Sequence, residues 1–260
     1  MHEDIPGTVK NTRSKIDSSP AASIRGDMLR TTRWEELGNK DPRVPPAFVI
    51  EFSPDAHTSS ACERYGIALP SQLHHAVAKR QAEFIMGRLA AHQAIERLGI
   101  AASTPGIGAS REPLWQAGVT GSISHTDDIA AAIAVPAPTV TGVGIDIEKV
   151  PNAETRDAIR ALALTPDEQR LMEARRGHLT TNMLLITGFS AKESFFKGVF
   201  AVVGRYFDFD AVRVSGLDAD AGRLTLTLRQ TLCPSLVEGR SFEVGFKTLA
   251  RDTVATSFVW

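Results

Sequence analysis

The sequence is poor in several features that would place it in a common class of protein. Only two of its 260 residues are cysteines, Cys62 and Cys233, and they lie too far apart to suggest a metal site. Without a recognisable signal peptide, we expect two reduced thiols in a cytoplasmic protein. There is no run of about 18 apolar residues, so no membrane span is expected. The 29 basic and 30 acidic residues give a net charge of −1, which argues against a general nucleic-acid binder.

The chain divides into a polar N-terminal stretch and a remainder with regular apolar patterns. Residues 1–45 have no sustained apolar period, so we predict a poorly ordered or loosely packed arm. Further on, alternating or continuous apolar runs predict strands, and apolar residues at helical spacing predict helices. The predicted strands cover residues 48–52, 129–135, 144–148, 224–228, 242–246 and 254–259, and the predicted helices cover 76–98, 165–176 and a segment that begins near 190. This mixture predicts an α+β fold with two similar lobes and a cleft between them.

The segment from Gly144 to Glu148 is predicted to be a strand with two carboxylates on one face. Side chains alternate between the faces of a strand, so Asp146 and Glu148 point one way while Ile145 and Ile147 point into a core. Two such carboxylates repel each other unless a cation lies between them. Mg²⁺ typically takes one or two carboxylates together with water and substrate phosphates. The segment suggests a phosphate-handling metal site, and a solvated strand end with two surface acids is the alternative.

A second group of charged residues lies further along the chain. Ser190 followed by Glu193 predicts a capping box at a helix start, and Glu193 and Lys197 form an i, i+4 pair that supports a helix. Each of these features alone is explained by helix stability. Combined with the two carboxylates of the strand, however, Glu193, Lys192 and Lys197 supply the charges that a metal-bound pyrophosphate needs.

Three arginines and a histidine are weaker candidates. Arg80 and Arg88 are eight residues apart on a predicted helix, which places them on roughly one face and makes a joint anion site possible. Arg111 lies in a loop, and His125 follows Ser124 at the end of a short segment. Each of these side chains, taken alone, is more often a solvated or structural residue than a ligand.

Together these segments resemble a known family. The residues Gly-Ile-Asp-Ile-Glu at 144–148 and Phe-Ser-Ala-Lys-Glu-Ser-Phe-Phe-Lys at 189–197 are similar to the two-part signature of the 4′-phosphopantetheinyl transferases. Those enzymes move the phosphopantetheine arm of coenzyme A onto a serine of an apo carrier protein. The segments that resemble the siderophore-synthetase branch, the enterobactin component D type, are residues 80–88, 111–115 and 121–126. The resemblance covers roughly residues 47–250.

The resemblance implies a role for each residue of the two core motifs. Asp146, Glu148 and Glu193 would hold Mg²⁺, or Mn²⁺, against the coenzyme A pyrophosphate. Glu193 would also help to deprotonate the carrier serine, directly or through a water. Lys192 would contact the pyrophosphate, and Lys197 would neutralise or protonate the leaving adenosine 3′,5′-bisphosphate.

The resemblance also implies a group that binds the 3′-phosphate and nearby phosphates of coenzyme A. Its members would be Arg80, Arg88 and His125, with Ser124 beside them and Arg111 as a further member. Other branches of the family place a lysine directly before the proline of the loop at 111–115, whereas this sequence has Glu112 there.

The family fold is a pseudo-dimer of two α+β lobes with the active site at their interface. We therefore expect a coenzyme A-binding lobe over residues 46–142 and a lobe with the metal and catalytic residues over 143–260, together in one monomer. The branch resemblance favours siderophore, nonribosomal peptide or polyketide synthesis as the pathway.

Two questions stay open at this point. Carrier proteins are usually acidic, so the predicted helix that carries Arg170, Arg175 and Arg176 is a candidate docking surface, with solvated arginines as the alternative. The competing function is a non-catalytic coenzyme A- or carrier-binding module, which would be expected to have lost Glu193 or Lys197. Another Mg²⁺-dependent phosphotransferase would need a nucleotide cradle, and no Gly-x-x-x-x-Gly-Lys-Ser/Thr loop is present.

Overall fold

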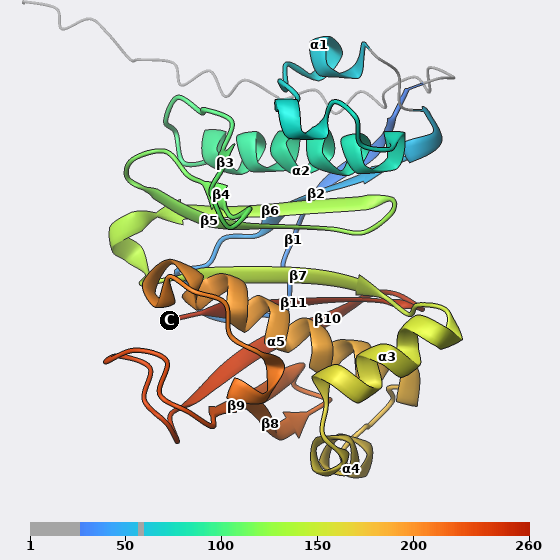
Figure 1. The fold of residues 1–260 in the computed structure, drawn as a ribbon, viewed down its shortest axis with the longest axis vertical. Coiled ribbons are helices and arrows are strands. Elements are labelled where there is room, and N and C mark those ends of the chain that lie inside the picture. Colours follow the sequence, from blue (N-terminus) through green and yellow to red (C-terminus); the bar gives the residue numbers. More distant parts are fainter. Residues whose placement is uncertain (1–26, 57–59) are drawn as a thin grey trace, which may run out of the picture.

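The chain forms two lobes, each built from a sheet and a long helix (Figure 1). The structure is a computed structural model that describes residues 27–56 and 60–260. The two sheets face each other in the middle of the molecule, and the long helices α2 and α5 lie on their outer sides (Figure 1). The predicted α+β class is therefore confirmed. Within the described residues, no helix is long and apolar enough to cross a membrane, and both cysteines are free thiols.

The first sheet has four antiparallel strands in the order β1-β2-β6-β5. The strands are β1 (Leu29–Glu35), β2 (Ala47–Phe52), β6 (Ile129–Pro136) and β5 (Val119–His125). Helix α2 (Ala78–Glu96) packs against β2, β5 and β6. These elements confirm the predicted strands at residues 48–52 and 129–135 and the predicted helix at 76–98, with ends shifted by one or two residues.

The second sheet has five antiparallel strands in the order β7-β11-β10-β9-β8. The strands are β7 (Val143–Lys149), β11 (Thr253–Val259), β10 (Ser241–Ala250), β9 (Arg223–Leu228) and β8 (Val212–Asp218). Helix α5 (Thr181–Val203) packs against β7, β11 and β10. All four strands predicted in the second half of the chain are present.

Shorter elements complete the two lobes. They are helices α1 (Ala61–Tyr65), α3 (Ala153–Ala163) and α4 (Pro166–Ala174), strands β3 (Gly106–Ile107) and β4 (Pro113–Leu114), and 3-10 turns η1 (Pro54–Ala56), η2 (Ser71–Leu73), η3 (Ala137–Thr139) and η4 (Phe209–Ala211). The predicted capping box of α4 is present: the Thr165 hydroxyl accepts from the Glu168 N–H, and the Glu168 carboxylate accepts from the Thr165 N–H. The helix ends at Ala174, two residues earlier than predicted.

The two lobes repeat one arrangement. In each, a strand precedes the long helix, and a later hairpin returns so that its last strand pairs antiparallel with that first strand. In the first lobe these strands are β2 and the hairpin β5–β6, and in the second they are β7 and the hairpin β10–β11. This shared topology supports the pseudo-dimer that the sequence led us to expect.

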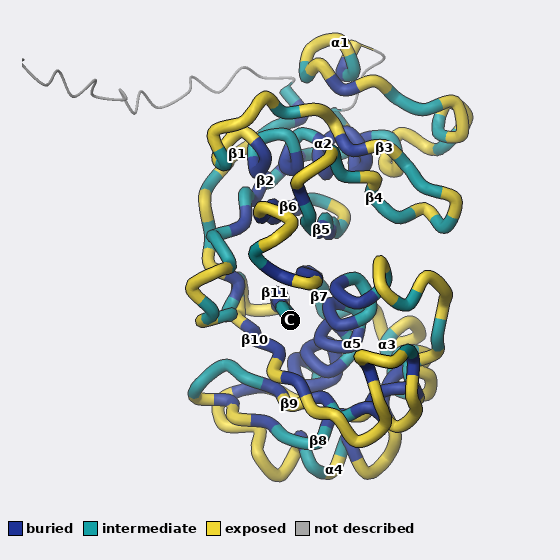
Figure 2. The backbone as a smooth tube through the Cα atoms, turned by 90° about the vertical axis from the view of Figure 1, so that its left-hand side faces the viewer, coloured by how far each residue is buried: buried dark blue, intermediate teal, exposed yellow. Residues whose placement is uncertain are grey.

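Three apolar clusters form the core. One lies between α2 and the first sheet, another lies between α5 and the second sheet, and the third joins the two sheets. Strand β6 belongs to two of them: Ala130, Ala132 and Ala134 pack under α2, whereas Ile129, Ala131, Ile133 and Val135 face the second sheet. Because both faces are covered, its sequence is continuously apolar instead of alternating. Figure 2 shows the buried stretches concentrated along α5 and the inner strands.

The structure corrects part of the predicted N-terminal arm. Residues 29–35, which we placed in that arm, form β1 and pair with β2. β1 is an edge strand whose side chains are mostly exposed, so backbone pairing holds it and its sequence carries no apolar period. Residues 1–26 lie outside the described residues. The lobe limits at 46–142 and 143–260 stay a prediction, and β1 would extend the first lobe toward the N-terminus.

The predicted helix start near Ser190 is wrong. Helix α5 begins at Thr181, where the Thr180 hydroxyl accepts a hydrogen bond from the Met183 N–H, and Ser190 lies in the middle of the helix. Its hydroxyl is buried and hydrogen-bonds the hydroxyl of Thr256 on β11, at 2.9 Å, so it does not cap a helix. Ser190 and Glu193 therefore have the spacing of a capping box without forming one. The Ser190 hydroxyl contacts the second sheet, and Glu193 belongs to the charged site described in the next section.

Candidate active site

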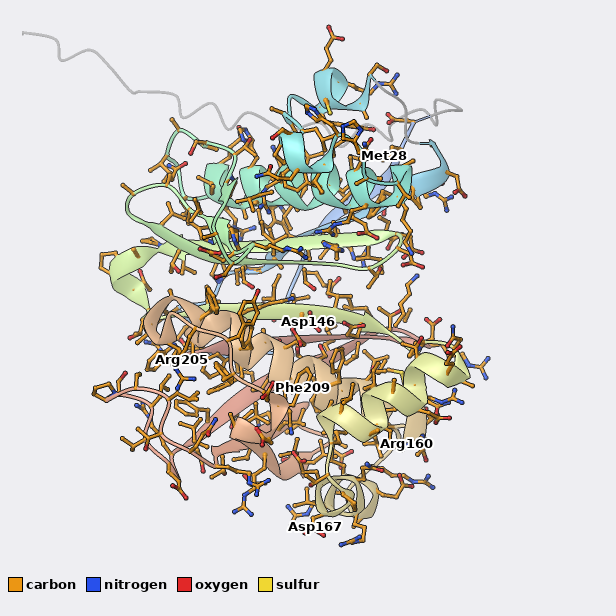
Figure 3. The ribbon with its side chains drawn as sticks, viewed as in Figure 1. Met28, Asp146, Arg160, Asp167, Arg205 and Phe209 are labelled. Atoms are coloured by element: carbon orange, nitrogen blue, oxygen red, sulfur yellow. The ribbon has the colours of Figure 1, made fainter. Side chains whose placement is uncertain are left out.

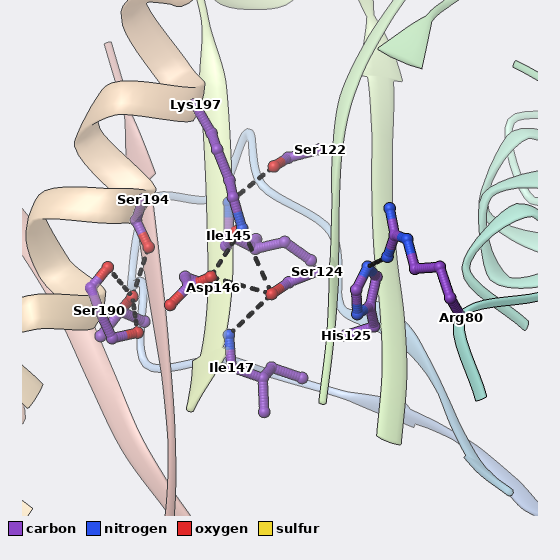
Figure 4. Close-up of polar contacts among 11 residues, drawn as sticks. Arg80, Ser122, Ser124, His125, Ile145, Asp146, Ile147, Ser190, Ser194 and Lys197 are labelled. Carbon is purple, nitrogen blue, oxygen red and sulfur yellow. Dashed lines mark hydrogen bonds and ion pairs between the residues drawn. The ribbon is translucent and has the colours of Figure 1, made fainter. Parts of the chain in front are cut away.

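Asp146 is a residue of β7 and lies at the junction of the two lobes, next to α5 (Figure 3). Only 4% of its surface is exposed. Its Oδ1 atom accepts hydrogen bonds from Lys197 Nζ at 2.6 Å and from Ser124 Oγ at 3.0 Å (Figure 4). Its Oδ2 atom is buried and has no hydrogen-bond partner among the described residues. One oxygen of this carboxylate is thus saturated by the protein, and the other is left for a ligand that the protein does not supply.

Glycines allow α5 to lie directly on β7. A Cβ atom on Gly144 would lie 1.9 Å from the backbone oxygen of Ser194, and a Cβ on Gly142 would lie 1.9 Å from that of Gly198. Real side chains do not tolerate such contacts, so glycine is required at both positions. The close approach lets Lys197 reach from α5 to β7, where its Nζ also donates to the Ile145 carbonyl at 3.2 Å.

Two further carboxylates adjoin Asp146. Burial, together with the charges of Asp146 and Glu193, raises the pKa of Glu148 to about 8, and Lys197 opposes this shift. Burial and the charge of Asp146 also raise the pKa of Glu193. Asp146 is buried, Glu148 and Glu193 are partly buried, and both glutamates lie close enough to Asp146 and Lys197 for those charges to act on them. A bound cation would relieve their repulsion.

The cluster is not a complete metal cage. In the part of the chain that the structure describes, no three or more His, Cys, Asp or Glu side chains converge closely enough to hold a metal ion by themselves. Mg²⁺ does not require such a cage, since it usually binds one or two carboxylates together with water and substrate phosphates. The donors are all hard oxygens, and Asp146 Oδ2 is buried without a partner, so the residues present fit Mg²⁺.

The structure does not bring Lys192 to this cluster. Its Nζ atom forms an ion pair with Glu168 Oε1 at 2.7 Å and donates to the Phe209 carbonyl at 3.2 Å. Both charged side chains are at most 3% exposed. Burial lowers the pKa of Lys192, and the charge of Glu168 opposes that shift. Successive helical residues point about 100° apart, so Glu193 faces the cluster while Lys192 faces α4. The predicted pyrophosphate contact of Lys192 is therefore not supported by this geometry.

A second charged group lies on the other face of β5, toward α2. Arg80 Nη1 lies 2.8 Å from His125 Nε2 and 3.0 Å from Glu83 Oε2. Burial, followed by the charge of Arg80, lowers the pKa of His125 to about 4. Because arginine can only donate, His125 Nε2 accepts this hydrogen bond and the ring is neutral. The sequence did not single out Glu83, although its place three residues after Arg80 on a helix is a sufficient signal.

Arg88 is the least compensated cation of this group. It is 7% exposed, its guanidinium stacks on Phe84 at 4.7 Å, and it donates to the Gly106 carbonyl at 3.0 Å. Its Nε atom is buried without a partner, and no carboxylate of residues 27–56 or 60–260 pairs with it. Burial lowers its pKa to about 10, with Arg80 adding to the shift. A buried guanidinium without a counter-ion is well suited to an anionic ligand.

A cleft of about 620 Å³ opens beside the carboxylate cluster, between the first lobe and α5. The residues that line it include Arg111, Trp115, Phe196, Lys197, Phe200 and Tyr206. The Tyr206 hydroxyl donates to the Ser110 carbonyl at 2.8 Å and so spans the two walls. Among the described residues, Arg111 is the only non-glycine with positive φ, at 69°. The volume falls within the range of small-molecule sites. The sequence motif contained Phe196, but we assigned no role to its aromatic side chain.

The predicted site residues thus lie in three neighbouring places. The carboxylates Asp146, Glu148 and Glu193 gather around Lys197, and Arg80, Arg88 and His125 gather on the α2 side of β5. Arg111 lines the cleft. Ser124, which we expected beside the phosphate group, points the other way and contacts Asp146. Neighbouring residues of a strand point to opposite faces, which explains why Ser124 faces Asp146 while His125 faces α2.

The fold and this cluster define an α+β enzyme whose charged groups gather between two lobes. Two family models match the chain: the 4′-phosphopantetheinyl transferase N-terminal domain matches residues 69–135, and the 4′-phosphopantetheinyl transferase superfamily matches residues 142–247. The chain belongs to the 4′-phosphopantetheinyl transferase superfamily. As a member, it is a transferase that acts on coenzyme A and a carrier protein.

Named relatives agree with this assignment. The chain is 35% identical to enterobactin synthase component D of Salmonella typhi, over 64% of this chain and 68% of the relative. It is 38% identical to the protein of the same name from Escherichia coli (strain K12), over 57% of this chain and 68% of the relative. It is 33% identical to the 4′-phosphopantetheinyl transferase Svp of Streptomyces mobaraensis, over 74% of this chain and 77% of the relative.

Proposed function

We propose that this transferase modifies carrier proteins or carrier domains of siderophore or other nonribosomal peptide synthesis, in a Mg²⁺-dependent reaction. The observation that carries the proposal is the Asp146 Oδ2 atom, which has no partner among the described residues and is buried within a carboxylate cluster beside a cleft of about 620 Å³. The relatives named enterobactin synthase component D support the choice of pathway. We further propose that it works as a cytoplasmic monomer, because one chain carries both lobes and both cysteines are free.

The residues that would hold the metal are Asp146, through Oδ2, and Glu148, with Glu193 at the edge of the set. When bound, Mg²⁺ would supply charge neutralisation at the pyrophosphate of coenzyme A. Binding would also offset the burial and the repulsion from Asp146 and Glu193 that raise the pKa of Glu148. The lobe over residues 143–260 would carry these groups, and the lobe over residues 46–142 would hold the phosphates of coenzyme A.

In the proposed reaction, the serine hydroxyl of the carrier attacks the phosphorus atom that bears the pantetheine arm. A serine O–P bond forms, and the bond from phosphorus to the oxygen of adenosine 3′,5′-bisphosphate breaks. Glu193 would take the serine proton, directly or through a water, since its raised pKa makes the carboxylate a better base than a solvated one. Lys197 would face the charge that develops on the leaving group, because its ammonium lies at the cleft wall.

The proposal is tested by incubating an apo carrier domain of a nonribosomal peptide synthetase with coenzyme A, Mg²⁺ and this protein. Intact-protein mass spectrometry should show the carrier gaining the mass of one phosphopantetheine arm, and chelation of the metal should prevent the gain. Binding of coenzyme A with no gain on several carriers would favour the non-catalytic module.

Arg88 is expected to recognise a phosphate of coenzyme A. Replacing it with methionine should raise the KM for coenzyme A about tenfold or more, because a hydrogen bond to a charged group contributes about 1.5–3 kcal/mol. The variant should also lose any preference for coenzyme A over 3′-dephospho-coenzyme A. The matched control is Arg97→Met, since Arg97 lies at the end of the same helix and stacks on Trp34 but is exposed. An equal rise in KM for both variants would contradict the phosphate contact.

The arginines of α4 and of the two residues that follow it are a weaker docking candidate in the structure than in the sequence. Arg170 pairs with Asp167, and Arg176 pairs with Glu173 at 3.0 Å, so two of the three arginines at 170, 175 and 176 are already neutralised. We therefore expect the double variant Arg175→Glu, Arg176→Glu to change the KM for an acidic carrier less than fivefold. A larger rise in this KM, with the KM for coenzyme A unchanged, would restore α4 as a docking surface.

A further inference from the structure

Two serines join the sheets of the two lobes. Strands β5 and β7 belong to different sheets but lie side by side. The Ser122 hydroxyl accepts a hydrogen bond from the Ile145 N–H, and the Ser124 hydroxyl accepts one from the Ile147 N–H, both at 3.0 Å. Ser122 is 2% exposed and Ser124 is 4% exposed. The two hydroxyls thus satisfy buried N–H groups that would otherwise be costly to leave unpaired.

Only one of the two serines reaches the charged cluster. Ser124 Oγ donates to Asp146 Oδ1 at 3.0 Å and lies 3.3 Å from Lys197 Nζ (Figure 4). A hydroxyl has one proton and two lone pairs. Ser124 gives its proton to the carboxylate and accepts from the Ile147 N–H and the lysine, so its hydrogen-bonding capacity is full. Its orientation is therefore fixed, and so is the oxygen of Asp146 that it holds.

We propose that Ser124 is a positioning residue that selects which oxygen of Asp146 is offered to the metal. Together with Lys197, its hydroxyl occupies Oδ1, so the buried Oδ2 atom is the one left free. Because Ser124 belongs to the first lobe and Asp146 to the second, the hydroxyl also couples the position of the carboxylate to the coenzyme A-binding lobe. This inference rests on the proposed metal-dependent function.

The chain supplies a matched control. Ser122 lies on the same strand, has the same burial and bridges to the same partner strand, but no hydrogen bond joins it to Asp146. Ser122→Ala and Ser124→Ala each remove one bridge to an N–H group of β7, so both should lower folding stability, and Ser124→Ala should lower it more because it also removes the contacts with Asp146 and Lys197. Only Ser124→Ala should also free the Asp146 carboxylate to turn.

The experiment measures metal binding independently of catalysis. Mn²⁺ is titrated into wild type, Ser122→Ala and Ser124→Ala with one equivalent of coenzyme A, and free Mn²⁺ is read from its electron paramagnetic resonance signal after subtraction of a coenzyme A blank. Ser124→Ala should bind Mn²⁺ about tenfold more weakly, as expected when an outer hydrogen bond to a metal ligand is lost. Ser122→Ala should stay within about twofold of wild type, and Ser124→Thr, which keeps the hydroxyl, should recover most of the affinity.

The outcomes separate this inference from the proposed function. Equal affinities in the two alanine variants would overturn the role of Ser124, as would no binding of Mn²⁺ by wild type. If Ser124→Ala does not fold, Ser124→Thr decides: affinity near that of wild type supports the role, and a tenfold loss despite the hydroxyl refutes it. If wild type binds Mn²⁺ but transfers no arm to carriers, the proposed function fails while the comparison of the serines still stands.

Discussion

Replacing Asp146 by asparagine is expected to lower the rate of phosphopantetheine transfer by about a hundredfold or more. The substitution keeps the shape of the side chain but removes the charge of a buried carboxylate whose Oδ2 atom has no partner among the described residues. Loss of a single electrostatic contact of this kind typically costs on the order of 3 kcal/mol in the transition state. Glu193→Gln should produce a loss of similar size, because an amide cannot accept the serine proton. The measurement is the initial rate of carrier modification at saturating coenzyme A and Mg²⁺.

A suitable control is Asp128→Asn. Asp128 also pairs with a lysine, Lys149 at the end of β7, but its side chain is 44% exposed and stands outside the carboxylate cluster. The transfer rate of this variant should stay within about threefold of wild type. Full activity in both Asp146→Asn and Glu193→Gln, with carriers fully modified at the usual rate, would refute the assignment of the site.

Replacing Lys192 by methionine is expected to lower the free energy of unfolding by about 3–5 kcal/mol, the usual cost of leaving a buried charge without its partner. Glu168 would lose its ammonium partner while still accepting from the N–H groups of Val214 and Thr165, both at 2.7 Å. The ion pair of Lys192 with Glu168 joins α5 to α4, and the bond from Val214 to Glu168 joins α4 to β8, so the destabilisation should extend across the second lobe. Urea unfolding monitored by circular dichroism measures the change.

The exposed pair Arg170–Asp167 provides the comparison. Its side chains are 72% and 86% exposed, so Arg170→Met should cost less than about 1 kcal/mol. The double variant Lys192→Met, Glu168→Gln should regain part of the lost stability, because no buried charge remains. The contrary outcome is that Lys192→Met is as stable as Arg170→Met but has a greatly raised KM for coenzyme A. That result would instead support the pyrophosphate contact of Lys192 that the family resemblance implied.

Much of the fold could be predicted from local patterns. Strand β9 alternates strictly because one face is buried, and the continuous apolar run of β6 reflects burial on both faces. The predictions failed where local sequence is ambiguous. Strand β1 is held by pairing with β2 and not by an apolar face, so it lacks the apolar pattern that marks the other strands. At Ser190, a spacing that usually marks a helix start occurs inside a helix, because the hydroxyl is needed against Thr256.

The same distinction applies to the site. The alternation of β7 was sufficient to place Asp146 and Glu148 on one face. The separation of Lys192 from Glu193, and of Ser124 from His125, also follows from helix and strand geometry, yet the partner on each side depends on tertiary packing. Glu168, which takes up Lys192, lies 24 residues away in the sequence, and Ser124 lies 22 residues from Asp146. Local sequence predicts the face to which such a side chain points, but it does not predict which residue the side chain contacts there.

The apolar layer between the two sheets has a consequence for how the protein denatures. That layer takes residues from β2 and β6 of the first lobe and from β7 and β11 of the second, so neither lobe can lose its structure without exposing the other. Although the topology is that of two repeated halves, the described part of the chain should melt as one cooperative unit. A gene cut between the halves would therefore yield two fragments with one bare hydrophobic face each, prone to aggregate unless they are produced together.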